Sequence, residues 1–318
     1  MDGKSLEALQ KRARSAYFWA IFFSAAVFLA IVSTLLFFLL SSRTGMAYLK
    51  ESPAEMLVGV TVLPALLAVA IYCFFYHLFV RKTYETFDQA FKNTYVLQTV
   101  REQEGFEKLT YSPAGGFSYN EIYDSMVVNS GEAKYFKKED QLAGTLHAIP
   151  FSCCDVVTRY LRCNGKKSEI RTIFQGQIIR FSLPEGSKWS FGHLQIFEKE
   201  FLSDLKGRRA PCQIQTENEA FNERFEVFAA DEHNAFYLLT PRMMEQIVRF
   251  ADFADCQIAL AFVGAMLYVA VERSHSMFNA SIRRPLEEQR RQILDDADLI
   301  RRAEEMLIRE TGILQQIG

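Results

Sequence analysis

The chain has 318 residues, of which 49% are hydrophobic and 23% are charged, and its formal net charge is −2. Such a length suits one large domain or two small ones. The small net charge excludes a chain-wide electrostatic attraction to nucleic acid or to anionic lipid, so we expect no nucleic-acid partner.

Two uncharged apolar runs near the N-terminus predict a transmembrane hairpin over residues 16–80. Residues 16–40 are 25 consecutive uncharged residues, and a helix of that length, at about 1.5 Å per residue, exceeds the roughly 30 Å hydrocarbon core of a bilayer. A cleaved signal peptide has an apolar region of only about 7–15 residues. Residues 56–80 also lack Asp, Glu, Lys and Arg. We therefore predict two spans, 16–40 and 56–80, that contact the lipid bilayer.

The basic residues around the two runs predict the orientation of this hairpin. Short segments rich in Lys and Arg favour the cytoplasmic side. The segment before the first run contains Lys4, Lys11, Arg12 and Arg14. The segment after the second run contains Arg81, Lys82 and Lys92. The connecting loop contains only Arg43 and Lys50. We predict a multi-pass protein of the inner (plasma) membrane, with residues 1–15, the main domain and the C-terminus in the cytoplasm and the loop 41–55 outside.

Residues 81–110 predict a membrane-proximal helix. Apolar residues between Tyr84 and Val100 recur at spacings of three and four, which indicates one helical face that ends near Gly105. Residues 111–117 contain Pro and two Gly and predict turns, and a short helix is expected over 119–124.

The region 111–280 predicts an α+β domain with a mainly antiparallel sheet. Its clearest β signal is Asn164-Gly165, because this pair suits the left-handed positions of a tight hairpin turn. Thr240 and Pro241 are typical of a helix start. The expected strands are 155–163, 167–174, 177–183, 225–229 and 237–239, and the expected helix is 242–253.

A third uncharged stretch, residues 256–271, has only 16 residues. A helix of that length is too short to span a bilayer, and Val263-Gly264-Ala265 divides the stretch into two runs of strand length. We interpret it as a buried β-hairpin in the centre of the domain.

The tail, residues 281–318, predicts a charged amphipathic helix with a heptad stripe. Leucine and isoleucine recur every seven residues, at Leu286, Ile293, Ile300, Leu307 and Leu314. The companion positions of a coiled coil are weak, being Arg290, Ala297, Glu304 and Thr311. Two interpretations stay open. The helix rests its apolar ridge on the domain, or it binds a protein partner or a second copy through residues 283–317.

No recognised catalytic or metal-binding motif occurs in the sequence. There is no phosphate-binding Gly-rich loop, no Gly-x-Ser-x-Gly and no His-Glu-x-x-His, and the five histidines show no metal-ligand spacing. We therefore expect no cofactor, no metal and no catalytic residue. The polar groups Glu139-Asp140 and Asp231-Glu232-His233 are interpreted first as a solvated loop and a surface turn. The alternative places Glu139, Asp140, Asp231 and His233 in one cleft.

The six cysteines predict reduced thiols. None forms a Cys-x-x-Cys pair, and Cys153 is directly followed by Cys154. A disulfide framework would show more regular pairing. We interpret the cysteines as reduced and mostly buried, with a redox or metal role for Cys153 and Cys154 as the alternative.

Several phrases, in order along the chain, resemble landmarks of a bacterial membrane-anchored family, the domain-of-unknown-function family 3137. They are Tyr111-Ser-Pro-Ala-Gly-Gly-Phe117, Glu139-Asp140 followed by Gly144, Phe174-Gln-Gly176, Phe225-Glu-Val-Phe228 followed by Asp231, and Leu239-Thr-Pro241. The resemblance extends from the second apolar run to about residue 280 and leaves out the tail. It implies a cytoplasmic domain behind an N-terminal hairpin and supplies no catalytic residues.

Three functional hypotheses follow. The first is a membrane-tethered interaction or regulatory module, which is the one we favour because the domain lacks a recognisable reaction centre. The second is an enzyme of unfamiliar type built on the four polar residues named above. The third is a lipid- or peptide-binding domain at the inner membrane surface, with Lys137, Lys138, Lys166 and Lys167 as its candidate face.

Overall fold

The computed structural model describes residues 3–41, 53–165, 167–183, 191–202 and 208–313. The chain divides into two compact units, Met1–Tyr95 with Ala280–Leu286, and Val96–Asn279 with Glu287–Gly318. Most of the expected loop 41–55, as well as Lys166 and Leu314, lies outside the described residues.

The first unit is built from long helices. These are α1 (Gly3–Ser41), α3 (Pro53–Phe75), the π-helical turn η1 (Tyr76–Val80), α4 (Arg81–Ala90) and most of the π-helical stretch η2 (Phe91–Val96). Helices α1 and α3 pack together, with the rings of Phe23 and Phe75 stacked at 6.0 Å. The stretches Lys4–Phe38 and Pro64–Arg101 are helical, long enough and apolar enough to cross a membrane. The two apolar runs therefore form helices, as the sequence predicts.

A short segment from far along the chain completes this helical unit. Gln10 Nε2 donates to the carbonyl oxygens of Ser281 and Arg284, each at 2.8 Å. Arg283 donates to the Tyr17 hydroxyl at 2.8 Å, and the Tyr84 hydroxyl donates to the Ala280 carbonyl at 3.2 Å. Residues 280–286 thus belong with the helices, which the sequence does not indicate.

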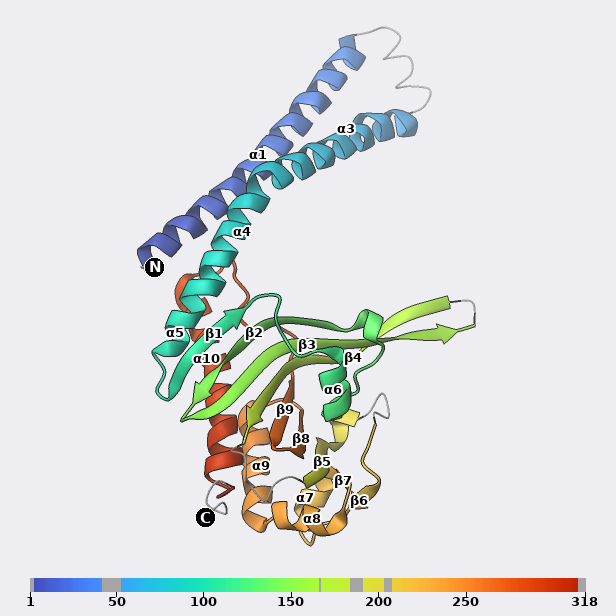
Figure 1. Ribbon diagram of the computed structural model, residues 1–318. Helices are drawn as coiled ribbons and strands as arrows, with labels where there is room; N and C mark the ends of the chain where they lie inside the picture. Colours follow the sequence, from blue (N-terminus) through green and yellow to red (C-terminus); the bar gives the residue numbers. More distant parts are fainter. Residues whose placement is uncertain (1–2, 42–52, 166, 184–190, 203–207, 314–318) are drawn as a thin grey trace. The chain divides into compact units, whose positions relative to one another are not determined.

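The second unit is organised around one nine-stranded sheet in which every pairing is antiparallel (Figure 1). The strand order is β1-β2-β3-β4-β9-β8-β5-β7-β6. The strands are β1 (Phe106–Ser112), β2 (Lys137–Leu146), β3 (Ile149–Asn164), β4 (Lys167–Ser182), β5 (Phe191–Glu198), β6 (Cys212–Ile214), β7 (Phe225–Ala229), β8 (Ile258–Gly264) and β9 (Met266–Glu272). The predicted α+β class with an antiparallel sheet is confirmed.

The two faces of the sheet have different covers. On one face, the core residues Cys154, Val156 and Ile178 pack with Ile122 of α6 (Tyr119–Ser125) and with Phe117, which precedes this helix. Because side chains alternate along a strand, Cys153, Asp155 and Gln177 lie on the opposite face. Helices α9 (Pro241–Ala254) and α10 (Leu286–Glu304) cover that face, and α9 also contacts η5 (Glu305–Arg309), which continues α10.

Local signals explain where most helices begin. Ser118 and Glu121 form a reciprocal capping box at the start of α6, and Thr240 caps α9 with Pro241 as its first residue.

The expected strand 237–239 is wrong. Tyr237 and Leu238 end the helix α8 (Glu232–Leu238), and Leu239 is its C-cap. The helix begins here because the Asp231 side chain accepts a hydrogen bond from the His233 amide. The short helices η3 (Ala133–Tyr135), η4 (Lys199–Leu202) and α7 (Glu219–Arg224) carry no signal that we recognised.

The hairpin at Asn164-Gly165 is confirmed, and it is longer than predicted. Strands β3 and β4 pair from Phe151↔Phe181 to Asn164↔Lys167, and Gly165 has a φ of 61°. The strands expected at 167–174 and 177–183 are one continuous strand, β4. The stretch 256–271 forms β8 and β9, the buried hairpin that we predicted. The helix expected from 81 ends as α5 (Leu97–Arg101), a few residues before Gly105.

The tail helix belongs to the core of the second unit. Ile293, Ile300 and Leu307 of the heptad stripe are buried, and so are the companion positions Ala297 and Glu304. The apolar ridge therefore rests on the chain itself, which was one of the two interpretations left open. Deletion of the tail would remove core residues rather than a separate interaction segment.

This placement predicts a large effect of truncating the ridge. Ile300→Ala should lower the free energy of unfolding by about 2–5 kcal/mol, because it leaves a cavity at a fully buried position. Denaturant unfolding of the purified full chain, followed by circular dichroism, measures this. The exposed Arg291 on the same helix provides the control, since Arg291→Ala should change stability by no more than about 0.5 kcal/mol. Equal effects of the two variants would contradict the buried ridge.

Candidate functional site

An irregularity in β2 brings two consecutive carboxylates to the same side of the sheet. Neighbouring residues of a regular strand point to opposite faces. The pairing of β2 with β3 shifts register between Glu139 and Leu142, and Asp140 has a φ of 59° and donates its amide to the Pro113 carbonyl at 2.9 Å. Such a bulge redirects a side chain. Glu139 and Asp140 therefore both lie close to Asp155.

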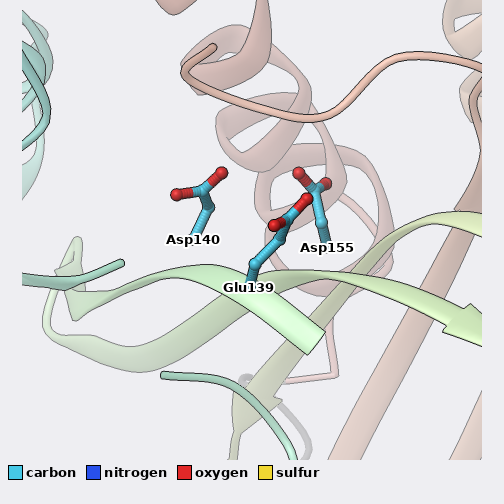
Figure 2. Close-up of side chains that lie close together, drawn as sticks. All are labelled: Glu139, Asp140 and Asp155. Carbon is cyan, nitrogen blue, oxygen red and sulfur yellow. The ribbon is translucent and has the colours of Figure 1, made fainter. Parts of the chain in front are cut away.

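Glu139, Asp140 and Asp155 form the carboxylate cluster shown in Figure 2. Asp155 of β3 is the register partner of Glu139. Each residue offers one carboxylate oxygen, and these three oxygens all lie within 4.8 Å of one another. Asp140 is 0% exposed and Asp155 is 5% exposed, whereas Glu139 is exposed to solvent. The cluster thus has two buried members and one open to water, and its oxygens are close enough to share one metal ion.

Residues 273–278, the segment that follows β9, pass next to the cluster. The Met277 amide donates to Asp155 Oδ2 at 2.6 Å, and the Ser276 hydroxyl donates to Glu139 Oε1 at 3.1 Å. From the other side, the Tyr111 hydroxyl donates to Asp140. The segment 273–278 therefore orients two of the carboxylates, and Tyr111 of β1 orients the third.

A second buried polar group lies beside Asp155. Gln177 pairs with Asp155 across β3 and β4, and its Nε2 donates to Asp296 Oδ1 of α10 at 3.3 Å. Arg273 binds the same Asp296 oxygen at 2.8 Å. Asp296 and Gln177 are both 0% exposed. The residues 273–278 and α10 are thus connected to the sheet through buried charges and amides.

Burial and like charges make Asp155 a weak acid. Burial raises the pKa of Asp155 to about 8, the Met277 amide opposes this rise, and the negative charges of Asp140, Asp296 and Glu139 add to it. Burial also raises the pKa of Asp296 to about 6, although Arg273 acts in the opposite direction. Such displaced carboxyl pKa values are common where a protein binds a ligand or moves a proton.

A solvent-accessible pocket of ≈ 400 Å³ lies next to these residues. We call it the acidic pocket, because four carboxylates are among its lining groups. It is lined by Asp255, Glu272, Arg273, His275, Asp295 and Asp296, among others. Arg273 and Asp296 belong both to its wall and to the buried group beside Asp155.

The structure separates the four residues proposed for one cleft. Glu139 and Asp140 lie on β2, the second strand in the sheet order, whereas Asp231 and His233 follow β7, the eighth. Six strand spacings of about 4.8 Å amount to roughly 29 Å. Asp231 instead caps α8, and the His233 ring contacts Tyr237. The single cleft is therefore wrong.

The interpretation of Glu139-Asp140 as a solvated loop is also wrong for Asp140, which is buried in β2. Sequence reasoning missed Asp155, Gln177 and Asp296 as well. One signal was present for Asp155, since a charged residue interrupts the apolar run Phe151-Ser-Cys-Cys-Asp-Val-Val157. Gln177 and Asp296 carry no comparable signal, because their closeness to Asp155 arises only from strand pairing and helix packing.

Among the described residues, Lys137, Lys138 and Lys167 do not form the binding face that we proposed. Lys137 pairs with Val157 and Lys167 pairs with Asn164, seven residues farther along β3. Seven residues of strand cover roughly 23 Å. Lys138 donates to the Gly116 carbonyl at 2.8 Å.

The two adjacent cysteines cannot act together. Cys154 packs in the core under α6 while Cys153 lies on the other face. Burial raises the pKa of Cys154 to about 12 and raises that of Cys153 well above its usual value. All six cysteines are free thiols, but only Cys153 and Cys154 are buried, so the expectation of mostly buried thiols is wrong. Cys73 and Cys163 are exposed.

The family model described as "Protein of unknown function (DUF3137)" matches residues 172–316. This region of the chain is therefore similar to the DUF3137 family. The match confirms the resemblance and includes Phe174-Gln-Gly176, Phe225-Glu-Val-Phe228 and Leu239-Thr-Pro241, while the earlier phrases precede it. It also includes the tail, contrary to our prediction that the resemblance stops near residue 280. No curated protein and no solved structure matches the chain.

The DUF3137 match includes only some of the residues of the site. Gln177, Arg273 and Asp296 lie inside it, whereas Glu139, Asp140 and Asp155 precede it. The site therefore joins β4, residues 273–278 and α10 of the matched region to β2 and β3, which come before residue 172.

The pKa of Asp155 predicts a pH dependence of stability. The folded chain keeps the Asp155 proton up to about pH 8, whereas an unfolded aspartate loses it near pH ~4. The folded state thus binds more protons in this window, and the free energy of unfolding should fall from pH 6 to pH 8 by at most about 3 kcal/mol. Thermal unfolding of the full chain, with a chelator present, measures the fall.

Asp155→Asn tests the origin of this dependence, since an amide does not ionise. The variant should show a flatter profile than the native chain, and the control Glu107→Gln, at an exposed position of β1, should keep the native slope. Equal slopes for the native chain and Asp155→Asn would show that other groups cause the dependence.

Proposed function

We propose that the chain is a membrane-tethered interaction or regulatory module. In this proposal residues 16–80 insert into the lipid bilayer as a two-helix hairpin, and the α+β domain stands on the cytoplasmic side of the inner (plasma) membrane. The observation that carries the proposal is the large apolar surface that α1 and α3 leave uncovered.

The exposed side chains of these helices are large and apolar. Phe37 is 72% exposed, Phe38 is 75% exposed and Leu66 is 62% exposed. A soluble protein seldom exposes an apolar patch beyond about 300–600 Å². A bilayer removes such surface from water, and Tyr17 and Trp19 near the start of the first run suit its interfacial region. The basic residues on both flanks favour cytoplasmic ends.

The burial and the separation of the polar residues favour a role in interaction over a role in catalysis. In the described part of the chain, the carboxylate cluster is mostly buried beside residues 273–278, and the polar residues near α8 lie many strands away. A protein partner or second copy bound through residues 283–317 stays a prediction. Since the apolar ridge of α10 is buried, such a partner would have the exposed side of this helix as its surface.

Membrane fractionation tests the anchor. The native chain should stay in the membrane pellet after an alkaline carbonate wash, whereas Leu29→Arg combined with Leu66→Arg should move to the supernatant. Each arginine at a span centre costs roughly 2.5–3.5 kcal/mol. The control is Tyr237→Arg in α8, at a position 63% exposed on the second unit, which should stay in the pellet. Release of the native chain by carbonate would refute the anchor.

The orientation has its own test. In a background without Cys73, Cys163, Cys212 and Cys256, a cysteine introduced at position 44 or at position 169 is treated with a membrane-impermeant maleimide in intact cells. We expect labelling at position 44, in the predicted external loop, and at position 169 only after the cells are lysed, because β4 belongs to the predicted cytoplasmic domain. Labelling of position 169 in intact cells would reverse the proposed topology.

A further inference from the structure

We infer that Glu139, Asp140 and Asp155 bind one hard divalent cation beside residues 273–278. The inference goes beyond the membrane-tethered module proposed above and does not depend on it, since every residue involved lies in the second unit.

The spacing of the three oxygens suits a single ion. Bonds from Ca²⁺ to oxygen are about 2.3–2.6 Å long. Two ligand oxygens on opposite sides of the ion are therefore at most about 4.6–5.2 Å apart. The three oxygens lie within 4.8 Å of one another, from three separate side chains. Mg²⁺, with bonds of about 2.0–2.1 Å, limits that separation to about 4.2 Å. Ca²⁺ is therefore accommodated with the smaller rearrangement.

A buried oxygen without a partner points to a missing ligand. Asp155 is 5% exposed, and its Oδ2 accepts from the Met277 amide, but its Oδ1 has no hydrogen-bond partner among the described residues. Figure 2 shows the Asp155 carboxylate directed toward that of Glu139. An unpaired buried carboxylate oxygen costs free energy, which a cation at this point would offset.

A neutral side chain next to Asp155 gives the second indication. Gln177 is 0% exposed and stands opposite Asp155 on β4. Its Nε2 donates to Asp296, and its Oε1 has no partner in the described part of the chain. Buried amide oxygens of this kind are usually satisfied by a protein donor, an ordered water or an ion. A water bound to the cation would satisfy it.

Two members of the cluster lack a positively charged partner in the described part of the chain. Arg273 forms an ion pair with Asp296, which accepts a hydrogen bond from Gln177. Among the described residues, no Lys or Arg forms an ion pair with Glu139 or Asp155. Carboxylate oxygens are the ligands preferred by Mg²⁺, Ca²⁺ and Mn²⁺, and the solvent-exposed side of Glu139 leaves room for coordinated water.

The rival explanation is a proton shared between Asp155 and a neighbouring carboxylate. A proton would relieve the same repulsion without any ion. The two explanations differ in what they predict for metal uptake, because a cluster that needs only a proton takes up no Mn²⁺ at neutral pH.

The test is Mn²⁺ uptake by the full chain in detergent after treatment with a chelator and its removal. The electron paramagnetic resonance signal of free Mn²⁺ reports binding, and Ca²⁺ and Mg²⁺ are added as competitors. We expect saturable uptake of about one Mn²⁺ per chain, displaced by Ca²⁺ more readily than by Mg²⁺, from the bond lengths above.

Two variants remove ligands, and two controls remove acids elsewhere. Glu139→Gln and Asp155→Asn should each weaken Mn²⁺ binding at least tenfold, about the loss seen even for outer-shell partners of a metal site. Glu107→Gln on β1 and Glu169→Gln on β4, both exposed, should leave it unchanged. Glu139 is exposed, so its variant should fold even if Asp155→Asn does not, and circular dichroism checks both.

The inference is overturned if the native chain takes up no Mn²⁺, which would favour the shared proton. It is also overturned if Glu139→Gln binds as tightly as the native chain, or if the controls lose binding to the same degree. Failure of the carbonate experiment, by contrast, leaves the ion site untouched, so the two proposals are tested separately.

Discussion

The antiparallel pairing of β3 with β4 is the constraint on which the second unit depends. It extends from Phe151↔Phe181 to Asn164↔Lys167, and β2 and β9 pair with its two outer edges. Because side chains alternate across a strand, this one register decides which residues lie under α6 and which lie under α10. A slip by one residue would exchange Val156 and Asp155, which would move a carboxylate into the apolar core under α6.

The same register produces the carboxylate cluster. Asp155 lies opposite Gln177 on one side and Glu139 on the other, so three strands contribute polar groups at one level of the sheet. The bulge of β2 adds Asp140, and the amide of Met277 approaches from the chain after β9. Burying several acids at one point is unfavourable by itself. The surrounding fold must therefore stabilise an arrangement that its apolar packing alone would not select.

Sequence reasoning succeeded where the signal is local. The uncharged length of residues 16–40, the Asn-Gly turn, the Thr-Pro helix start and the glycine between β8 and β9 each act within a few residues, and each predicted element exists. It failed where the determinant is distant. The cluster forms only because residues about 140, 155 and 177 become neighbours in the sheet. The strand predicted at 237–239 is wrong for a local reason, because Asp231 caps α8, which ends at Leu238.

One phrase on which the resemblance to the DUF3137 family rests has a physical reason in this fold. In Phe174-Gln-Gly176, Phe174 is buried in the core under α6, and a Cβ added at Gly176 would lie 2.1 Å from the Val271 carbonyl oxygen of β9. Any other residue there would push β9 away from β4. The phrase therefore maintains the contact between β4 and β9, and Gln177 directly follows it.

The packing of the tail helix α10 against the sheet depends on small and acidic residues. Its heptad stripe of leucine and isoleucine left association with a partner open, although the companion positions carry Ala297 and Glu304 instead of the large apolar residues of a coiled coil. Both are buried. Glu304 meets His147 at 3.1 Å and Arg309 at 3.0 Å, and Asp296 meets Arg273 at 2.8 Å. A small residue and two paired acids thus let α10 lie close against the sheet. The features that weaken it as a coiled coil are those that fit it to the polar, cluster-bearing face of its own domain.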